Sequence, residues 1–77
     1  AILQDNKNNF WITTVDKGVW YYDGKTFKNL TENDGLVNNA VMNVLKDNSD
    51  NLWFGTKFFG LSRYDGKTLR TFSQYDN

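Results

Sequence analysis

The sequence contains no cysteine and no histidine among its 77 residues. Without them the chain cannot form a disulfide, and it lacks the usual ligand sets for a zinc ion. Pairs of serine or cysteine with histidine are likewise excluded as nucleophiles, and so is acid–base catalysis by imidazole. We therefore expect no metal, no cofactor and no catalytic residue in this chain, and we predict that it is not an enzyme.

A charge excess and long apolar runs are also missing. Nine basic and nine acidic residues give a net charge of zero, and they are scattered along the chain. A protein that binds phosphate backbones is expected to show a basic stripe. A membrane-spanning helix needs about 20 apolar residues, and the apolar runs here are only a few residues long. We expect no nucleic acid partner and no membrane contact by this segment.

The strongest signal in the sequence is an internal repeat at a constant offset of 42 residues, which aligns Ile2 with Val44 without a gap. Of the 34 aligned pairs, 13 are identical, among them Trp11 with Trp53 and Gly18 with Gly60. A period in the forties that consists of short strands is typical of propeller blades.

Each repeat contains four segments rich in aromatic and β-branched residues, bounded by clusters of Asn, Asp and Gly. Asp-Gly at residues 23–24 and 65–66 predicts tight hairpin turns between the third and fourth segments. The expected strands are 1–4, 10–14, 18–22 and 26–31, then 41–46, 52–56, 60–64 and 68–73. We predict an all-β fold of two four-stranded antiparallel β-propeller blades, at residues 1–40 (with a truncated first strand) and 41–77.

The second strand of each repeat is apolar at consecutive positions, 10–12 and 52–54, so both faces of its sheet should be buried. A blade stacked between two neighbours needs this pattern. Two blades cannot close a ring, so we expect association with other propeller blades or with copies of the chain, in a larger or oligomerically completed propeller. The residues predicted for the inter-blade core are Trp11, Trp53, Tyr22 and Tyr64.

Uneven loop lengths point to one edge of the blades as the binding edge. Loops 14–18 and 56–60 and the linker 31–40 fall on the edge opposite the tight turns, and binding residues are often found on loops. Phenylalanine rings there could stack on a sugar, with polar neighbours bonding its hydroxyls; alternatively, the rings pack under a neighbouring blade's loop. The candidate ligand-binding residues are Asp16, Lys17, Asn38, Asn39, Lys57, Phe58 and Phe59.

A calcium loop is a weaker interpretation of the turn at Asp47, Ser49 and Asn51, which have the spacing of the first three ligands. Phe58 stands where the bidentate glutamate is needed, and Leu52 stands at the position of the turn glycine. The pattern favours a turn over a metal site.

The segments Asp47-Asn-Ser-Asp-Asn-Leu-Trp-Phe-Gly-Thr56 and Gly60-Leu-Ser-Arg-Tyr-Asp65 resemble the two-component regulator propeller repeat. The first repeat departs from this pattern, with Thr13 in place of the glycine found at Gly55. The resemblance implies the extracytoplasmic sensor region of a hybrid histidine kinase or related regulator. A small ligand, with an oligosaccharide as the candidate, would bind on the periplasmic or extracellular side of a bacterial membrane protein. The signal would pass to a kinase module elsewhere.

Two other functions remain open at this stage. One is a structural or protein-interaction propeller that binds no small molecule. The other, which the sequence favours least, is a propeller enzyme such as a lyase or glycosidase. Blades serve unrelated tasks, so the repeat alone does not decide among them.

Overall fold

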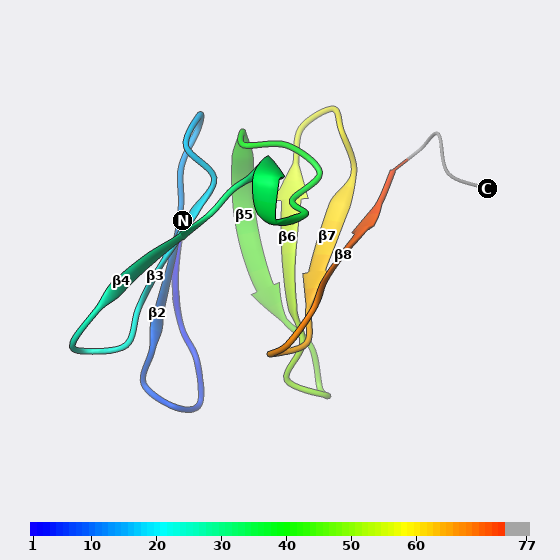
Figure 1. The fold of residues 1–77 in the computed structure, drawn as a ribbon. Helices are drawn as coiled ribbons and strands as arrows, with labels where there is room; N and C mark the ends of the chain where they lie inside the picture. The colour runs from blue at the N-terminus through cyan, green and yellow to red at the C-terminus, as the bar shows by residue number, and fades with distance from the viewer. Residues whose placement is uncertain (74–77) are drawn as a thin grey trace.

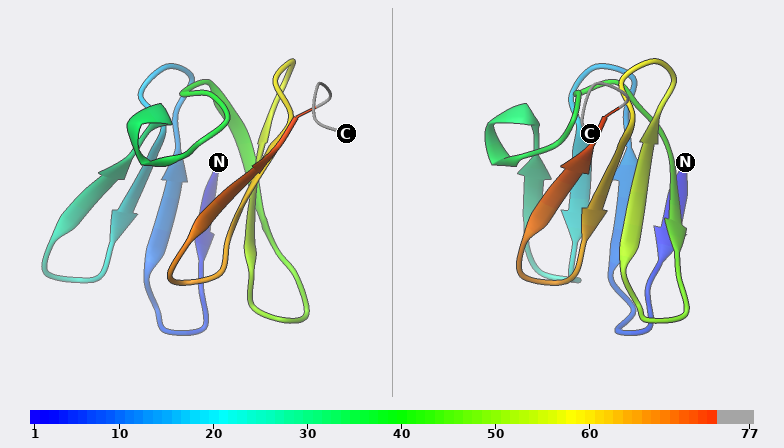
Figure 2. Two further views of the ribbon diagram at one scale, coloured as in Figure 1. Left: turned by 45° about the vertical axis from the view of Figure 1, so that its right-hand side comes forward. Right: turned by 90° about the vertical axis from the view of Figure 1, so that its right-hand side faces the viewer.

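The computed structural model describes residues 1–73, so the last four residues of the second predicted unit lie outside the described part. Two four-stranded antiparallel sheets stand face to face (Figures 1 and 2). The first sheet contains β1 (Ile2–Gln4), β2 (Phe10–Thr13), β3 (Val19–Tyr22) and β4 (Phe27–Leu30). The second contains β5 (Val41–Lys46), β6 (Leu52–Thr56), β7 (Leu61–Tyr64) and β8 (Leu69–Phe72). The predicted fold class is confirmed.

The predicted limits of β5 and β6 are confirmed, whereas each of the other strands is shorter than predicted by one residue at one or both ends. Gly18 has a φ of 75°, a left-handed conformation outside the strand region, so β3 begins at the next residue. The amide of Thr26 donates to Asp23 Oδ1 over 2.8 Å, and this bond assigns Thr26 to the turn rather than to β4. The conformation and hydrogen bonds of the turn residues thus determine where these strands begin.

The connections divide between two edges of the blades, as Figure 1 shows. The turn edge, at the bottom of that view, carries the four tight turns at residues 5–9, 23–26, 47–51 and 65–68. The loop edge, at the top, carries residues 14–18, 57–60 and the linker 31–40. This arrangement follows from the up-and-down order of strands in each sheet.

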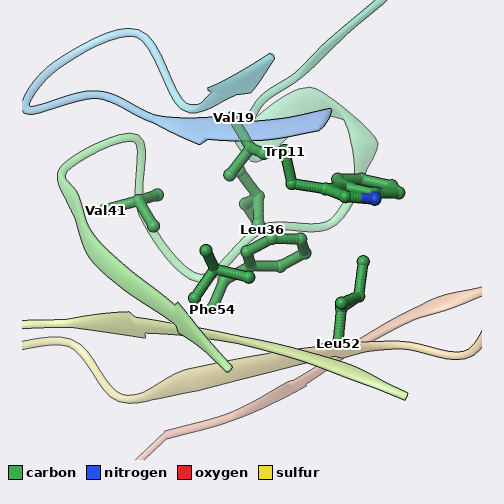
Figure 3. Close-up of a cluster of buried hydrophobic side chains, with 7 residues drawn as sticks. Trp11, Val19, Leu36, Val41, Leu52 and Phe54 are labelled. Carbon is green, nitrogen blue, oxygen red and sulfur yellow. The ribbon is translucent and has the colours of Figure 1, made fainter. Parts of the chain in front are cut away.

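The linker carries the chain from β4 to β5 and contains one turn of 3₁₀ helix, η1 (Glu32–Asp34). Thr31 and Asp34 form a reciprocal capping box, and Gly35 ends the turn with a φ of 111°. This turn places Leu36, which is only 5% exposed, between the two sheets (Figure 3).

The hydrophobic core therefore lies between the sheets rather than within either one (Figure 3). Its members are Trp11, Val19, Leu36, Val41, Val44, Leu52 and Phe54. A bulge in β5 between Val41 and Asn43 shifts the register, which allows both Val41 and Val44 to be buried despite their odd spacing. Among the described residues, no helix is long and apolar enough to cross a membrane.

Candidate functional site

A cleft of about 420 Å³ opens between the two sheets towards the turn edge. The sheets approach each other where β5 contacts β1 and β2. The lining of the cleft extends to Tyr21 on β3 and Lys28 on β4 of the first sheet and to Tyr64 on β7 of the second. Its volume lies within the range of about 300–1,000 Å³ that small-molecule sites occupy.

Two facing rows of side chains supply much of the lining of the cleft, although Leu3 and Leu69 in these rows do not line it. The strand register places Leu3, Trp11, Tyr21 and Lys28 opposite one another across the first sheet. In the second sheet the corresponding row is Lys46, Leu52, Tyr64 and Leu69. Residues that are paired across antiparallel strands project from the same face, so each row presents one side to the other sheet.

Trp11, a member of the first row, contacts aromatic rings of both sheets. Its ring centroid is 4.6 Å from that of Tyr21, 5.4 Å from that of Tyr64 and 5.7 Å from that of Phe54. Only 4% of Trp11 is exposed, whereas both tyrosines are partly exposed. Aromatic and apolar surface therefore forms the floor of the cleft.

The indole of Trp11 is held by the turn that precedes its strand. Its Nε1 donates to Asp5 Oδ2 over 2.9 Å, while Asp5 Oδ1 accepts the amides of Lys7 and Asn9. Partial burial raises the pKa of Asp5, but these hydrogen bonds outweigh it and hold the pKa below its ordinary value of 3.8. Asn8 completes the turn with a φ of 65°, a conformation that Asn tolerates better than most residues.

The second repeat builds the same turn around Asp47. Its Oδ2 accepts the indole N–H of Trp53 over 2.9 Å, and its Oδ1 accepts the amides of Ser49 and Asn51. The bond from Trp53 is the main reason that the pKa of Asp47 falls from 3.8 to about 2. Both oxygens of the carboxylate thus accept hydrogen bonds within the turn. Within residues 1–73, no three acidic side chains come together in a group that could hold a metal ion.

A short polar chain joins the two sheets at the turn edge beside the cleft. Lys46 Nζ donates to Asn6 Oδ1 over 2.6 Å, and Asn6 Nδ2 donates to Asp50 Oδ1 over 2.9 Å. These contacts connect the β1–β2 turn with the β5–β6 hairpin. They bridge the two turns across the mouth of the cleft.

The seven residues predicted to bind a ligand all lie on the loop edge, and none of them lines the cleft. Asn39 has a structural position: its main-chain oxygen accepts the amide of Gly18, and its side-chain oxygen accepts that of Glu32. Asn38 Oδ1 accepts the amide of Ala40. Asp16 and Lys17 lie exposed in the loop that the linker contacts through Gly18.

Lys57, Phe58 and Phe59 form an exposed cluster on the loop of the second sheet. Phe58 is 68% exposed, its ring meets that of Phe59 edge-on at 6.4 Å, and Lys57 Nζ lies 5.2 Å from its centroid. The structure thus brings these three residues together, and it separately connects Asn39 with the loop that carries Asp16 and Lys17.

The four residues predicted for the inter-blade core lie on three different faces. Trp11 and Tyr64 meet between the sheets. Tyr22 stacks on Phe27 at 4.4 Å on the outer face of the first sheet. Trp53 packs against Phe72 at 5.8 Å, with the guanidinium of Arg63 5.7 Å from its ring, on the outer face of the second sheet.

Sequence reasoning missed Tyr21, Lys28 and Leu36. Leu36 is an apolar residue in a polar linker, and that contrast is a signal of burial. Tyr21 and Lys28 carry no such signal, because their role depends on the opposite sheet.

Comparisons with known proteins support the resemblance that the motifs indicate. Residues 35–58 match the model of the family described as two component regulator propeller. No curated protein and no solved structure matches the chain significantly. The match begins in the linker, covers β5 and β6, and ends in the following loop. This stretch thus matches the repeat that the sequence resemblance predicted, and it lies within two four-stranded antiparallel sheets.

Proposed function

We propose that this chain is part of the extracytoplasmic sensor propeller of a two-component regulatory system and binds a small saccharide ligand in the cleft between its two sheets. The observation that carries the proposal is the cleft itself, in a chain with a two-component regulator propeller repeat. In this proposal the chain binds the ligand, and a kinase module elsewhere in the parent protein performs the phosphoryl chemistry on the other side of a bacterial membrane.

The chemistry of the cleft supports a saccharide. Tyr21 and Tyr64 offer partly exposed rings, which pack well against the C–H faces of a sugar. Amide and hydroxyl groups of Asn6, Asn9 and Ser49 lie at the rim, where they can bond hydroxyl groups. Apolar lining with a few polar groups at the rim is the usual design of a small-molecule site.

The proposal is tested by titrating the isotopically labelled chain with neutral and acidic oligosaccharides and following its amide resonances. We expect saturable shifts at Tyr21, Lys28 and Tyr64. Shifts confined to Phe58 and Phe59 would instead place the ligand on the loop edge, where the sequence predicts it. In that case Phe58→Ala should abolish binding, with Val15→Ala, an exposed loop residue of the other repeat, as the control. Absence of saturable shifts with every saccharide would refute ligand binding.

A second candidate function is protein interaction, and the outer sheet faces favour it. On the second sheet, Leu45 is 66% exposed and lies in the same row as Trp53. The 42-residue offset makes this row the equivalent of the row of Leu3 and Trp11, which faces the second sheet. The outer face of the first sheet, with Tyr22, is likewise the equivalent of the face that covers Trp11.

Each outer face is thus equivalent to one of the two inner faces that already pack against each other. The two outer faces should therefore pack in the same way, against another propeller blade or a second copy of the chain. Sedimentation of Leu45→Glu tests this interface. We expect the unchanged chain to associate as its concentration rises and this variant to remain monomeric. Val15→Glu is the matched control, because Val15 is 74% exposed but lies in a loop outside the sheet faces. A chain that stays monomeric at high concentration would contradict the proposed interface.

A further inference from the structure

We infer that the ligand of the inter-sheet cleft is an acidic saccharide, whose anionic group is bound by the lysines around the cleft. This inference rests on the proposed function and specifies its ligand. Three lysines from three elements line the cleft: Lys7 in the β1–β2 turn, Lys28 on β4 and Lys46 at the end of β5. Their convergence depends on the pairing of the two sheets, since 39 positions of sequence separate Lys7 from Lys46.

Three aspartates, Asp5, Asp50 and Asp65, also line the cleft, so the charges of the three lysines are matched in number. The aspartates differ from the lysines in that hydrogen bonds from the protein already engage them. Asp5 accepts two amides and one indole N–H. Asp65 accepts the amides of Lys67 and Thr68 with Oδ1, and it accepts the Thr68 hydroxyl with Oδ2. Asp50 accepts from Asn6. The hydrogen-bonding capacity that remains for a ligand is thus mainly that of donors.

The lysine side chains retain this donor capacity. Within the described part of the chain, Lys7 and Lys28 have no side-chain hydrogen bond or ion pair. Lys46 uses one bond, to Asn6, and an ammonium group has three donors. Lysine donors to an anionic oxygen form charge-assisted hydrogen bonds, which are stronger than neutral ones. An anionic group placed against Lys7 or Lys28 therefore gains a charge-assisted bond that a neutral group does not.

The position of Lys28 makes this preference specific to a saccharide acid. Lys28 pairs with Tyr21 across β3 and β4, so its side chain leaves the same face of the sheet as the aromatic ring. A pyranose that packs on Tyr21 would carry a carboxylate or sulfate at its edge towards this lysine. Ring stacking and charge recognition would then act on one sugar unit.

The test compares trigalacturonate with its methyl ester, because esterification removes the charge and keeps the rings. We expect the ester to bind several-fold more weakly, and binding of the acid to weaken as salt rises from about 0.05 to 0.5 M. Lys28→Gln should weaken binding of the acid about five-fold, as expected for a partly exposed ion pair, and leave that of the ester unchanged. Lys25→Gln is the matched control, since Lys25 lies in a turn and does not line the cleft.

Equal affinities for acid and ester, or equal effects of Lys28→Gln and Lys25→Gln, would overturn this inference and leave saccharide binding intact. Amide shifts of the acid at Phe58 rather than at Tyr21 would overturn it as well. A sulfated disaccharide that binds with the same dependence on Lys28 would support it, and would show that the site recognises the oxyanion rather than the carboxylate alone. Failure of neutral and acidic saccharides alike would remove the proposed function together with this inference.

Discussion

Replacement of the two equivalent tryptophans should separate packing between the sheets from packing within a repeat. Trp11 and Trp53 occupy the same position of the repeat, and each donates its indole N–H to the aspartate of its own turn over 2.9 Å. The loss of that bond is therefore common to both alanine variants. What differs is the surroundings: Trp11 contacts aromatic rings of both sheets, whereas Trp53 contacts Phe72 of its own sheet and is partly exposed.

Trp11→Ala should lower the free energy of unfolding by about 3–5 kcal/mol, the usual cost of removing a buried tryptophan. Trp53→Ala should cost about 1–2 kcal/mol, because part of its apolar area is already exposed to water in the folded chain. A chain of 77 residues has a total stability of about 4–12 kcal/mol, so the first variant can lose most of its folded population.

Urea unfolding followed by far-ultraviolet circular dichroism, at low protein concentration, measures both losses. Trp11→Phe and Trp53→Phe keep an aromatic ring and preserve the comparison if Trp11→Ala does not fold. We expect the same order in this pair, with smaller losses. Equal losses for the two positions would refute the idea that packing between the sheets stabilises the chain.

Three further predictions follow from local geometry. Gly18→Ala should destabilise the fold more than Gly24→Ala in urea titrations: both residues have positive φ, but only at position 18 would the added Cβ meet a backbone oxygen, that of Leu30. Leu36→Ala should cost about 2–5 kcal/mol by the same assay, since it empties a site between the sheets. Asp47 has a pKa of about 2 in the folded chain against an ordinary value of 3.8, so its charge stabilises the fold above pH 3.8 and this contribution fades as the pH falls towards 2. Asp47→Asn should flatten the dependence of the urea midpoint on pH across that window.

The repeat and its turn residues were sufficient to predict the strands. Asp-Gly at residues 23–24 and the Asp5 and Asp47 turns mark where strands end, and these signals act within a few residues. The sequence could not tell which side of each blade would be covered. Trp11 and Trp53 are equivalent along the sequence, and only the order of the blades places one between sheets and the other on an outer face.

The cleft was beyond prediction from the sequence for a similar reason. It forms where the facing rows of two sheets come together. Tyr21 and Lys28, which pair within the first sheet, therefore share a cleft with Tyr64 only after the blades dock. Loop length instead indicated the opposite edge, where Phe58 and Phe59 are exposed. A pattern within one repeat describes that repeat, whereas a cleft depends on how two repeats are docked.

Because the second sheet repeats the first at an offset of 42 residues, the two outer faces of the pair are opposite faces of the repeat. One end of the pair displays the surface that carries Trp53, and the other displays the surface that carries Tyr22, so the two ends differ in chemistry. A row of such units can lengthen without altering either end, and each unit that joins contributes one complete junction. Two units are the shortest row that contains a junction at all, so the pair is the smallest piece of the array in which packing between units stabilises the fold.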